Sequence, residues 1–272
     1  MKLSEIYKIA DAIAPKALSD EMCQNYGWYD NSGILVNTDE EVNGILFSLD
    51  LTMAAVDEAI ARGVKLIITH HPAIYGKISR IDYDDSATLG TKLIKCIKNG
   101  ISVIAMHLNL DAAADGIDES LMQGVLLSAG EKNIADVQPI AKQVVLLNGA
   151  YGRVYDLSGV TLKTLAEGMK KTFATERLAV YGEGNKEIKR VASFCGSGAD
   201  EGSVAFAVRN GADVMISSDY KHHVLALALE VGLSVITLTH YASEEYGFKK
   251  YYEKIRQQVG IPCYFHADDL LR

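Results

Sequence analysis

Short apolar runs alternate along the chain with longer segments in which apolar residues recur every three or four positions. The short runs are rich in Ile, Val and Leu, which is typical of strands buried on both faces of a parallel sheet. The longer segments indicate amphipathic helices. This alternation predicts an α/β fold. The first half is expected to hold strands at 34–36, 42–49, 65–69 and 101–106, and helices at 4–17, 52–62, 88–98 and 118–128.

The rhythm is interrupted in the middle of the chain. Residues 130–150 lack the strand–helix pattern and contain Pro139, which predicts a linker or domain crossing near 130–140. We therefore expect a first α/β domain at 1–130 and a second at 131–272, whose C-terminal helix could pack back on the first. The second half is expected to hold strands at 151–155, 178–181, 188–194 and 233–238, and a helix at 162–173.

Two segments of the second half echo segments of the first. Residues 63–69 resemble 211–217, and residues 100–106 resemble 232–238, each beginning at a glycine. The echo favours two similar α/β domains, with the strand ends of both facing one cleft. Glycines that end helices are common before strands, and this habit alone would also produce such an echo.

Composition and charge narrow the classes of function. Hydrophobic residues make up 49% of the 272 residues, and the formal net charge is −8. An acidic surface repels phosphate backbones, which argues against broad nucleic-acid binding. No apolar run reaches the length of a membrane span, and the first residues do not form a signal peptide. The four cysteines are far apart, so we expect free thiols and a cytoplasmic location.

Two adjacent histidines end the apolar run at 65–69. His70 and His71 stand where the chain leaves the core, and Pro72 restricts His71 to an extended conformation. Functional groups of open α/β sheets gather at the carboxyl ends of strands, and two neutral imidazoles suit zinc or a similar divalent metal. Equally, one histidine could lie on the surface while the other caps a backbone carbonyl.

Two further pairs combine a histidine with an acid at a spacing of four. His240 and Glu244 follow the strand at 233–238, and in a helix this spacing places both side chains on one face. His107 and Asp111 follow the strand at 101–106. Alternatively, Glu244 is a first-turn acid favoured by the helix dipole, and Asp111 is a helix cap or turn residue.

The segment 217–223 carries a denser group of polar residues. It contains Asp219, Lys221, His222 and His223, which offer acid/base groups and one cation. The alternative is the start of a helix, with Asp219 as its cap. Six of the seven histidines lie at or just beyond strand ends with acids nearby, which favours a two-metal site that activates a water. Because no cysteine is close, a closed structural zinc site is disfavoured.

These motifs resemble those of the GTP cyclohydrolase I type 2 homologue family, also called Nif-three-like or dinuclear-metal-centre hexameric proteins. The resemblance spans nearly the whole chain, and the order of the motifs is that of the family. The matching stretches are residues 28–33, 49–52, 68–72, 107–111, 194–198, 218–223 and 240–244.

The resemblance implies a Nif-three-like fold of two α/β domains with a dinuclear metal site in the cleft between them, assembled as a homohexamer. Its metal ligands would be His70, His71, Asp111, His240 and Glu244. His107 and His223 would lie nearby as catalytic groups. Two divalent ions per subunit are expected, and Zn, Mn, Fe, Co and Ni all suit such ligands.

The activity that the family name implies is the opening of a purine nucleotide ring, with GTP or a relative as substrate and a metal-bound hydroxide as nucleophile. Lys77, Arg80 and Lys221 are cations that would hold the triphosphate, and spacing does not choose among them. The alternative is a non-enzymatic metal-binding ring that serves as a regulatory protein or scaffold.

Overall fold

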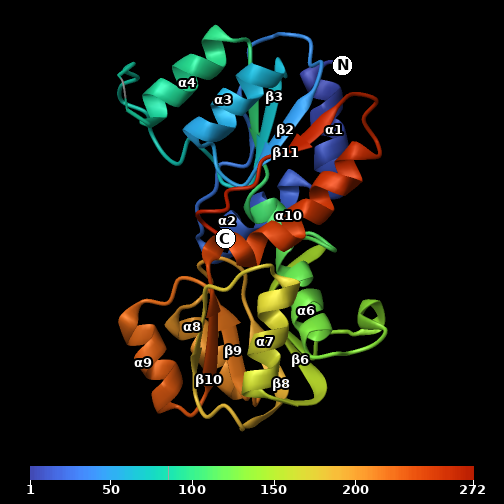
Figure 1. The fold of residues 1–272 in the computed structure, drawn as a ribbon, viewed down its shortest axis with the longest axis vertical. Coiled ribbons are helices and arrows are strands. Elements are labelled where there is room, and N and C mark those ends of the chain that lie inside the picture. The colour runs from blue at the N-terminus through green and yellow to red at the C-terminus, as the bar shows by residue number, and fades with distance from the viewer. Residues whose placement is uncertain (85) are drawn as a thin grey trace. The chain divides into compact units, whose positions relative to one another are not determined.

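The computed structural model describes residues 1–84 and 86–272, and these divide into two compact units. The first unit comprises Met1–Ala113 and Phe248–Ala267, and the second comprises Ala114–Gly247 and Asp268–Arg272. Each unit contains one sheet with helices packed on it, so the predicted pair of α/β domains is confirmed (Figure 1). The expected boundary between two independently folding domains, between residues 130 and 131, stays a prediction.

The sheet of the first unit has five strands in the order β1-β4-β3-β2-β11. The strands β2, β3, β4 and β11 are parallel, and β1 pairs antiparallel with β4. Every residue of β2, β3 and β4 is buried, as the short apolar runs predicted. The bounds are β1 Gly33–Val36, β2 Ile45–Ser48, β3 Leu66–Thr69, β4 Ser102–Ala105 and β11 Cys263–Phe265.

Helices cover both faces of this sheet. Leu46, Ile67 and Val103 on one face pack with apolar residues of α3 and α4 in a single buried cluster. On the other face, Phe47 contacts the rings of Phe248 and Tyr251 in α10. The helix bounds are α1 Leu3–Ile13, α2 Lys16–Tyr26, α3 Met53–Arg62, α4 Leu89–Lys98, α5 Leu108–Ala112 and α10 His240–Arg256.

Local sequence sets the ends of α3 as expected. The hydroxyl of Thr52 accepts a hydrogen bond from the Ala55 amide at the start, and Gly63 ends the helix at a φ of 68°. The expected helix at 4–17 was too long, because α1 ends before Pro15 and α2 begins after it. Sequence reasoning missed α2, which buries only Leu18, Ser19 and Met22 and so carries a weak apolar stripe.

The sheet of the second unit has six strands in the order β5-β6-β8-β9-β10-β7. β8, β9 and β10 are parallel, and the other pairs are antiparallel. In Figure 1, α6 and α7 lie on one face of this sheet and α8 and α9 on the other. The bounds are β5 Ala141–Leu146, β6 Gly149–Thr161, β7 Leu178–Tyr181, β8 Glu187–Ser193, β9 Val214–Ser217, β10 Ser234–Leu238, α6 Ile117–Ser128, α7 Leu162–Thr172, α8 Glu201–Arg209 and α9 His222–Glu230.

The segment 130–150, in which a linker was expected near 130–140, holds a short helical turn and a strand. It contains η1, Ile134–Asp136, and the strand β5, which forms an antiparallel hairpin with β6. β5 is an edge strand in which buried Val144 and Leu146 alternate with more exposed residues. Because half of its residues face outward, it lacks the continuous apolar run that identified the central strands.

The segments that resemble each other in the two halves form equivalent strands in the two units. β3 and β4 are parallel neighbours in the first unit, as β9 and β10 are in the second. In both units a helix precedes the second of these strands, α4 before β4 and α9 before β10. His70 and His71 follow β3, and His240 follows β10, so the candidate ligands stand at the carboxyl ends of central parallel strands.

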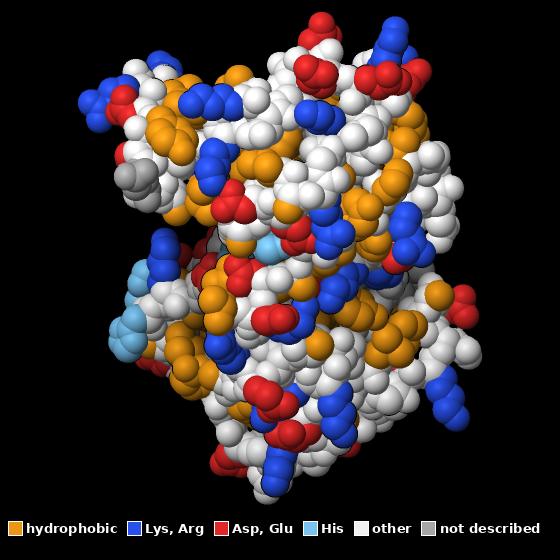
Figure 2. Space-filling view, turned by 45° about the horizontal axis from the view of Figure 1, so that its top comes forward, with side chains coloured by type: hydrophobic (Ala, Val, Ile, Leu, Met, Phe, Trp, Pro, Cys, Tyr) orange, Lys and Arg blue, Asp and Glu red, His pale blue; other side chains and the backbone are white. Residues whose placement is uncertain are grey.

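The surface shows no dominance of one sign of charge on the face seen in Figure 2, where Lys and Arg side chains are interspersed with Asp and Glu. Among the residues that the structure describes, no helix is both long enough and apolar enough to cross a membrane.

Candidate functional site

Three histidines of the first unit gather at the ends of β3 and β4. One ring nitrogen from each of His70, His71 and His107 lies within 4.8 Å of the others. The His70 side chain is fully buried, whereas those of His71 and His107 are partly exposed. The structure thus brings together three imidazoles that could hold a metal ion.

Each of these histidines has its Nδ1 atom next to an oxygen that accepts hydrogen bonds. Nδ1 of His70 lies 2.7 Å from the carbonyl oxygen of Met106. Nδ1 of His71 lies 2.9 Å from Asp50 Oδ1, and that of His107 lies 2.7 Å from Asp30 Oδ1. A carbonyl or carboxylate oxygen only accepts, so Nδ1 carries the proton and Nε2 carries the lone pair. This is the tautomer that binds a metal through Nε2.

Asp30 is the most elaborately held of these acceptors. Its carboxylate receives hydrogen bonds from the hydroxyls of Ser19 and Ser32, each at 2.5 Å, as well as from His107. Burial alone would raise the pKa of Asp30, but these hydrogen bonds outweigh it and hold the pKa well below its usual range. The carboxylate is therefore ionised at neutral pH and accepts the hydrogen bond from Nδ1 of His107.

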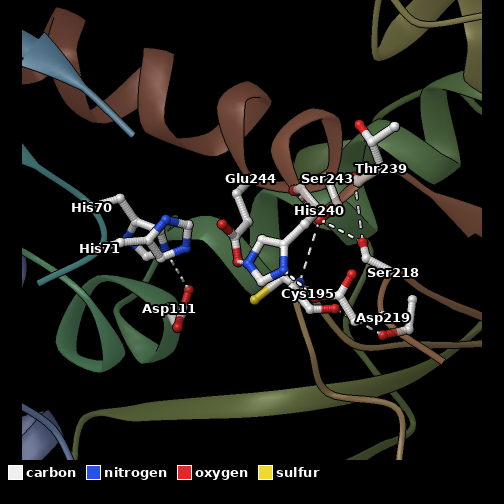
Figure 3. A network of polar contacts seen from close by, with 12 residues as sticks. His70, His71, Asp111, Cys195, Ser218, Asp219, Thr239, His240, Ser243 and Glu244 are labelled. Carbon is white, nitrogen blue, oxygen red and sulfur yellow. Dashed lines mark hydrogen bonds and ion pairs between the residues drawn. The ribbon is translucent and has the colours of Figure 1, made fainter. Parts of the chain in front are cut away.

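Asp111 brings a carboxylate to the same histidines. It lies in the short helix α5 directly after β4, and its Oδ1 atom is 3.5 Å from Nε2 of His70 (Figure 3). Two ligands about 2.0–2.2 Å from one metal ion are about 2.8–3.6 Å apart in tetrahedral or octahedral geometry. The His70 and Asp111 atoms have the separation that a shared ion requires.

The second unit contributes a histidine and an acid from one helix. α10 begins at His240, and the predicted i, i+4 pairing places Nε2 of His240 3.0 Å from Glu244 Oε1. On the other side of the ring, Nδ1 lies 2.5 Å from Oδ2 of Asp219, in the loop after β9 (Figure 3). Asp219 therefore holds His240 and does not cap a helix, since α9 has Lys221 at its N-cap.

Hydroxyl groups secure the start of α10. The Thr239 hydroxyl accepts a hydrogen bond from the Ala242 amide at 3.0 Å. Ser243 donates from its hydroxyl to the His240 carbonyl at 2.8 Å, and its Oγ lies 2.9 Å from Oγ of Ser218. These contacts fix the first turn of α10, and with it the direction in which His240 and Glu244 point.

Gly196 packs directly against these two side chains. A Cβ atom at this position would lie 2.2 Å from Glu244 Oε1 and 3.2 Å from His240 Nε2. The backbone also has a φ of +54°, a conformation that residues other than glycine rarely adopt. The turn at Gly196 therefore allows an approach to the carboxylate that no other residue permits.

A buried acid holds that turn in place. Asp118 is completely buried, and its carboxylate accepts hydrogen bonds from the Cys195 amide at 3.3 Å and the Gly152 amide at 3.0 Å. The buried guanidinium of Arg153 pairs with the same carboxylate. Asp118 thus connects the central strands of the second unit to the turn beside Glu244.

The remaining histidines have other surroundings. His223 is 63% exposed on α9, and its Nε2 atom lies 3.0 Å from Glu201 Oε1. Its predicted catalytic role stays a prediction. Nδ1 of His266 lies 2.6 Å from Oε2 of Glu58.

Sequence reasoning missed the acids that orient the histidines. No role was expected for Asp30 or Asp50, and Asp219 was expected to be an acid/base group or a helix cap, although each accepts a hydrogen bond from an Nδ1 atom. The available signal was that each follows or precedes a predicted strand, where polar side chains converge.

Comparison with known proteins identifies the relatives of this chain. The family described as Duf34/NIF3 (NGG1p interacting factor 3) matches residues 1–268. A protein of Clostridium acetobutylicum named "GTP cyclohydrolase 1 type 2 homolog" is 33% identical over 247 residues, which cover 90% of this chain and 85% of that protein.

Solved structures agree with this match. A hypothetical protein of Staphylococcus aureus has a TM-score of 0.80 and 26% identity, covering 98% of this chain and 97% of its own. Reduced HcgD from Methanocaldococcus jannaschii has a TM-score of 0.77 and 27% identity, covering 97% of both chains. With a family match across nearly its whole length and relatives of the same fold, the chain belongs to the Duf34/NIF3 family.

Proposed function

We propose that this protein binds two divalent metal ions and is a metal-dependent hydrolase of a purine nucleotide such as GTP. The ligands in this proposal are the ones that the family resemblance implies. They are His70, His71, Asp111, His240 and Glu244.

One observation carries the proposal. Because Asp219 holds the proton of His240 on Nδ1, the Nε2 lone pair faces Oε1 of Glu244 at 3.0 Å. Two atoms that both carry lone pairs repel each other at this distance unless a proton or a cation lies between them. Nε2 of His70 and Oδ1 of Asp111 repeat the arrangement at 3.5 Å. A metal ion bound between the nitrogen and the oxygen of each pair would explain both short distances.

The donor set also decides which ions fit. Imidazole nitrogens and carboxylate oxygens suit Zn, Mn, Fe, Co and Ni, and no choice among these follows from the ligands. The carboxylates of Asp50 and Asp219 hold their histidines as ligand-orienting acids do in metal sites.

The chemistry of hydrolysis follows from the donor set and its neighbours. Bound divalent ions supply an activated water and polarise the group under attack. His107 is the proposed proton carrier, because its ring is oriented by the hydrogen bond from Nδ1 to Asp30 and lies beside His70, with ring centres 5.3 Å apart. His223 is a second candidate proton carrier, with weaker support because it contacts Glu201.

The name of the Clostridium acetobutylicum relative supports GTP as the substrate to test first. The resemblance that suggests this reaction also suggests a homohexamer, and the widely separated cysteines suggest a cytoplasmic location. Light scattering of the purified protein tests the assembly separately from the metal content.

Metal analysis tests the proposal with a matched control. We expect about two ions per chain in the wild type, a clear loss in Glu244→Gln and no change in Glu253→Gln, a more exposed acid on the same helix. GTP turnover is then measured with the metal that is found. An absence of metal from the wild type would end the proposal, whereas metal without turnover would favour the non-enzymatic alternative.

A further inference from the structure

A pocket of ≈ 360 Å³ opens in the first unit beside His71. This size lies in the range of small-molecule binding sites. The polar lining comes from Asp50, Thr52, His71 and Lys92, and the rest of the lining is apolar. His71 is therefore both a lining residue of the pocket and a proposed metal ligand.

Lys92 is the only lysine or arginine in the pocket lining. It is half-buried on α4. The next lysine along the helix, Lys95, pairs with Asp57 at 2.6 Å, and the structure records no ion pair for Lys92 among the described residues. The acid of the pocket, Asp50, directs its Oδ1 atom to Nδ1 of His71 at 2.9 Å. The Lys92 ammonium is thus placed to meet an incoming anion.

The charged side chains of the lining are one acid, Asp50, and one base, Lys92, and the backbone adds positive partial charge. Thr52 is the N-cap of α3, and Leu89 is the first residue of α4, so the pocket wall includes the starts of both helices. Amide groups and the dipole at a helix start favour negative charge. The lysine and the two helix starts lie on the same side of the sheet, at the carboxyl ends of β2 and β3.

We propose that this pocket binds the phosphate groups of a phosphorylated substrate, with Lys92 as the charged contact. The proposal deepens the proposed function, since it places the phosphates on one side of His71 and the reacting part of the molecule on the side of His70 and His107. It also assigns a role to Lys92 that the sequence had suggested for other cations, one of which, Arg80, pairs with Asp82 instead.

Binding measurements on the full-length, metal-loaded protein test the assignment. The ligands are GTP, guanosine and inorganic pyrophosphate, measured by calorimetry against wild type, Lys92→Ala, Lys92→Arg and Lys95→Ala. We expect Lys92→Ala to weaken GTP and pyrophosphate binding about tenfold or more, because a charge-assisted contact to phosphate is lost. Lys92→Arg restores most of the affinity, and Lys95→Ala and guanosine binding are unaffected.

Metal content is measured in every variant, so the two proposals fail separately. Wild-type protein without metal contradicts the proposed function, whatever Lys92 does. Normal metal content together with unchanged GTP binding in Lys92→Ala overturns the phosphate pocket. Binding of pyrophosphate without any binding of GTP overturns the assignment to a phosphorylated substrate and leaves a site for free phosphates.

Discussion

A Cβ atom at Gly196 would lie 2.2 Å from Oε1 of Glu244. Glycine is therefore required at this turn for a reason specific to the carboxylate, in addition to its φ of +54°. The turn after β8 can approach the Glu244 carboxylate this closely only because residue 196 has no side chain.

Gly196→Ala is expected to displace the Glu244 carboxylate and lower the metal content of the purified protein. The positive φ alone costs about 1–2 kcal/mol of stability. Gly63→Ala is the matched control, since Gly63 has a φ of +68° and an added Cβ would meet no atom within 4 Å. Elemental analysis of both variants gives the answer. Wild-type metal content in Gly196→Ala would show that the two residues are not coupled.

Asp30→Asn is expected to slow turnover by about 100-fold or more while leaving metal content unchanged. An amide carries no charge and can turn its NH2 group toward Nδ1, so it does not hold the His107 ring in one orientation as the carboxylate does. The steady-state rate and the metal content of the same preparation provide the two readouts. A variant that loses its metal would instead make His107 a ligand.

The same substitution predicts a dependence of stability on pH. The folded protein holds the pKa of Asp30 below its unfolded value of about 3.9, so the ionised carboxylate stabilises the fold at neutral pH. That contribution is full above about pH 4 and is lost as the pH falls toward the folded pKa. The difference in unfolding free energy between wild type and Asp30→Asn should therefore shrink below pH 4. Urea titrations at pH 7 and pH 3 measure it, and an equal difference at both would contradict the predicted sign.

Asp118→Ala is expected to destabilise the protein by about 3–5 kcal/mol, because it leaves the buried guanidinium of Arg153 without its carboxylate. Asp156→Ala removes an exposed partner of Arg190 and should cost less than about 1 kcal/mol. Denaturant unfolding compares the two. Similar losses of unfolding free energy in the two variants would mean that the buried pair of Asp118 and Arg153 stabilises the fold no more than an exposed pair does.

Removal of metal should lower the melting temperature of the wild type and leave Glu244→Gln nearly unaffected. Ligands that bind only the folded state stabilise it in proportion to the logarithm of their concentration over Kd. Thermal unfolding with and without a chelator, followed by addition of zinc or manganese, measures the effect. A wild-type protein that melts identically with the chelator, although metal analysis finds ions, would show that they do not bind to the fold.

The sequence predicted the central strands and the positions of the candidate ligands well, because both depend on local pattern. β3 and β10 are short, mostly apolar strands. His70 follows β3 directly, and His240 follows β10 after Thr239. Within α10 the spacing of His240 and Glu244 correctly predicted a shared face. Features that depend on residues close together in the sequence could be predicted without a structure.

Features that depend on distant partners could not be recognised. His107 and Asp30 are 77 positions apart, and His240 and Asp219 are 21 apart, so no local spacing reports their hydrogen bonds. The turn at Gly196 lies 48 positions before Glu244 in the chain. Its contact with Glu244 depends on how β8 and α10 pack, and that packing has no signature in the sequence.

The central claim is that the Nε2 atoms of these histidines and the neighbouring carboxylates hold metal ions. Anomalous diffraction from crystals of the metal-loaded protein tests it most directly. We predict two peaks per chain, each within about 2.0–2.2 Å of ligand atoms drawn from His70, His71, Asp111, His240 and Glu244. A proton alone between His240 and Glu244, with no anomalous peak near either side chain, would contradict the account.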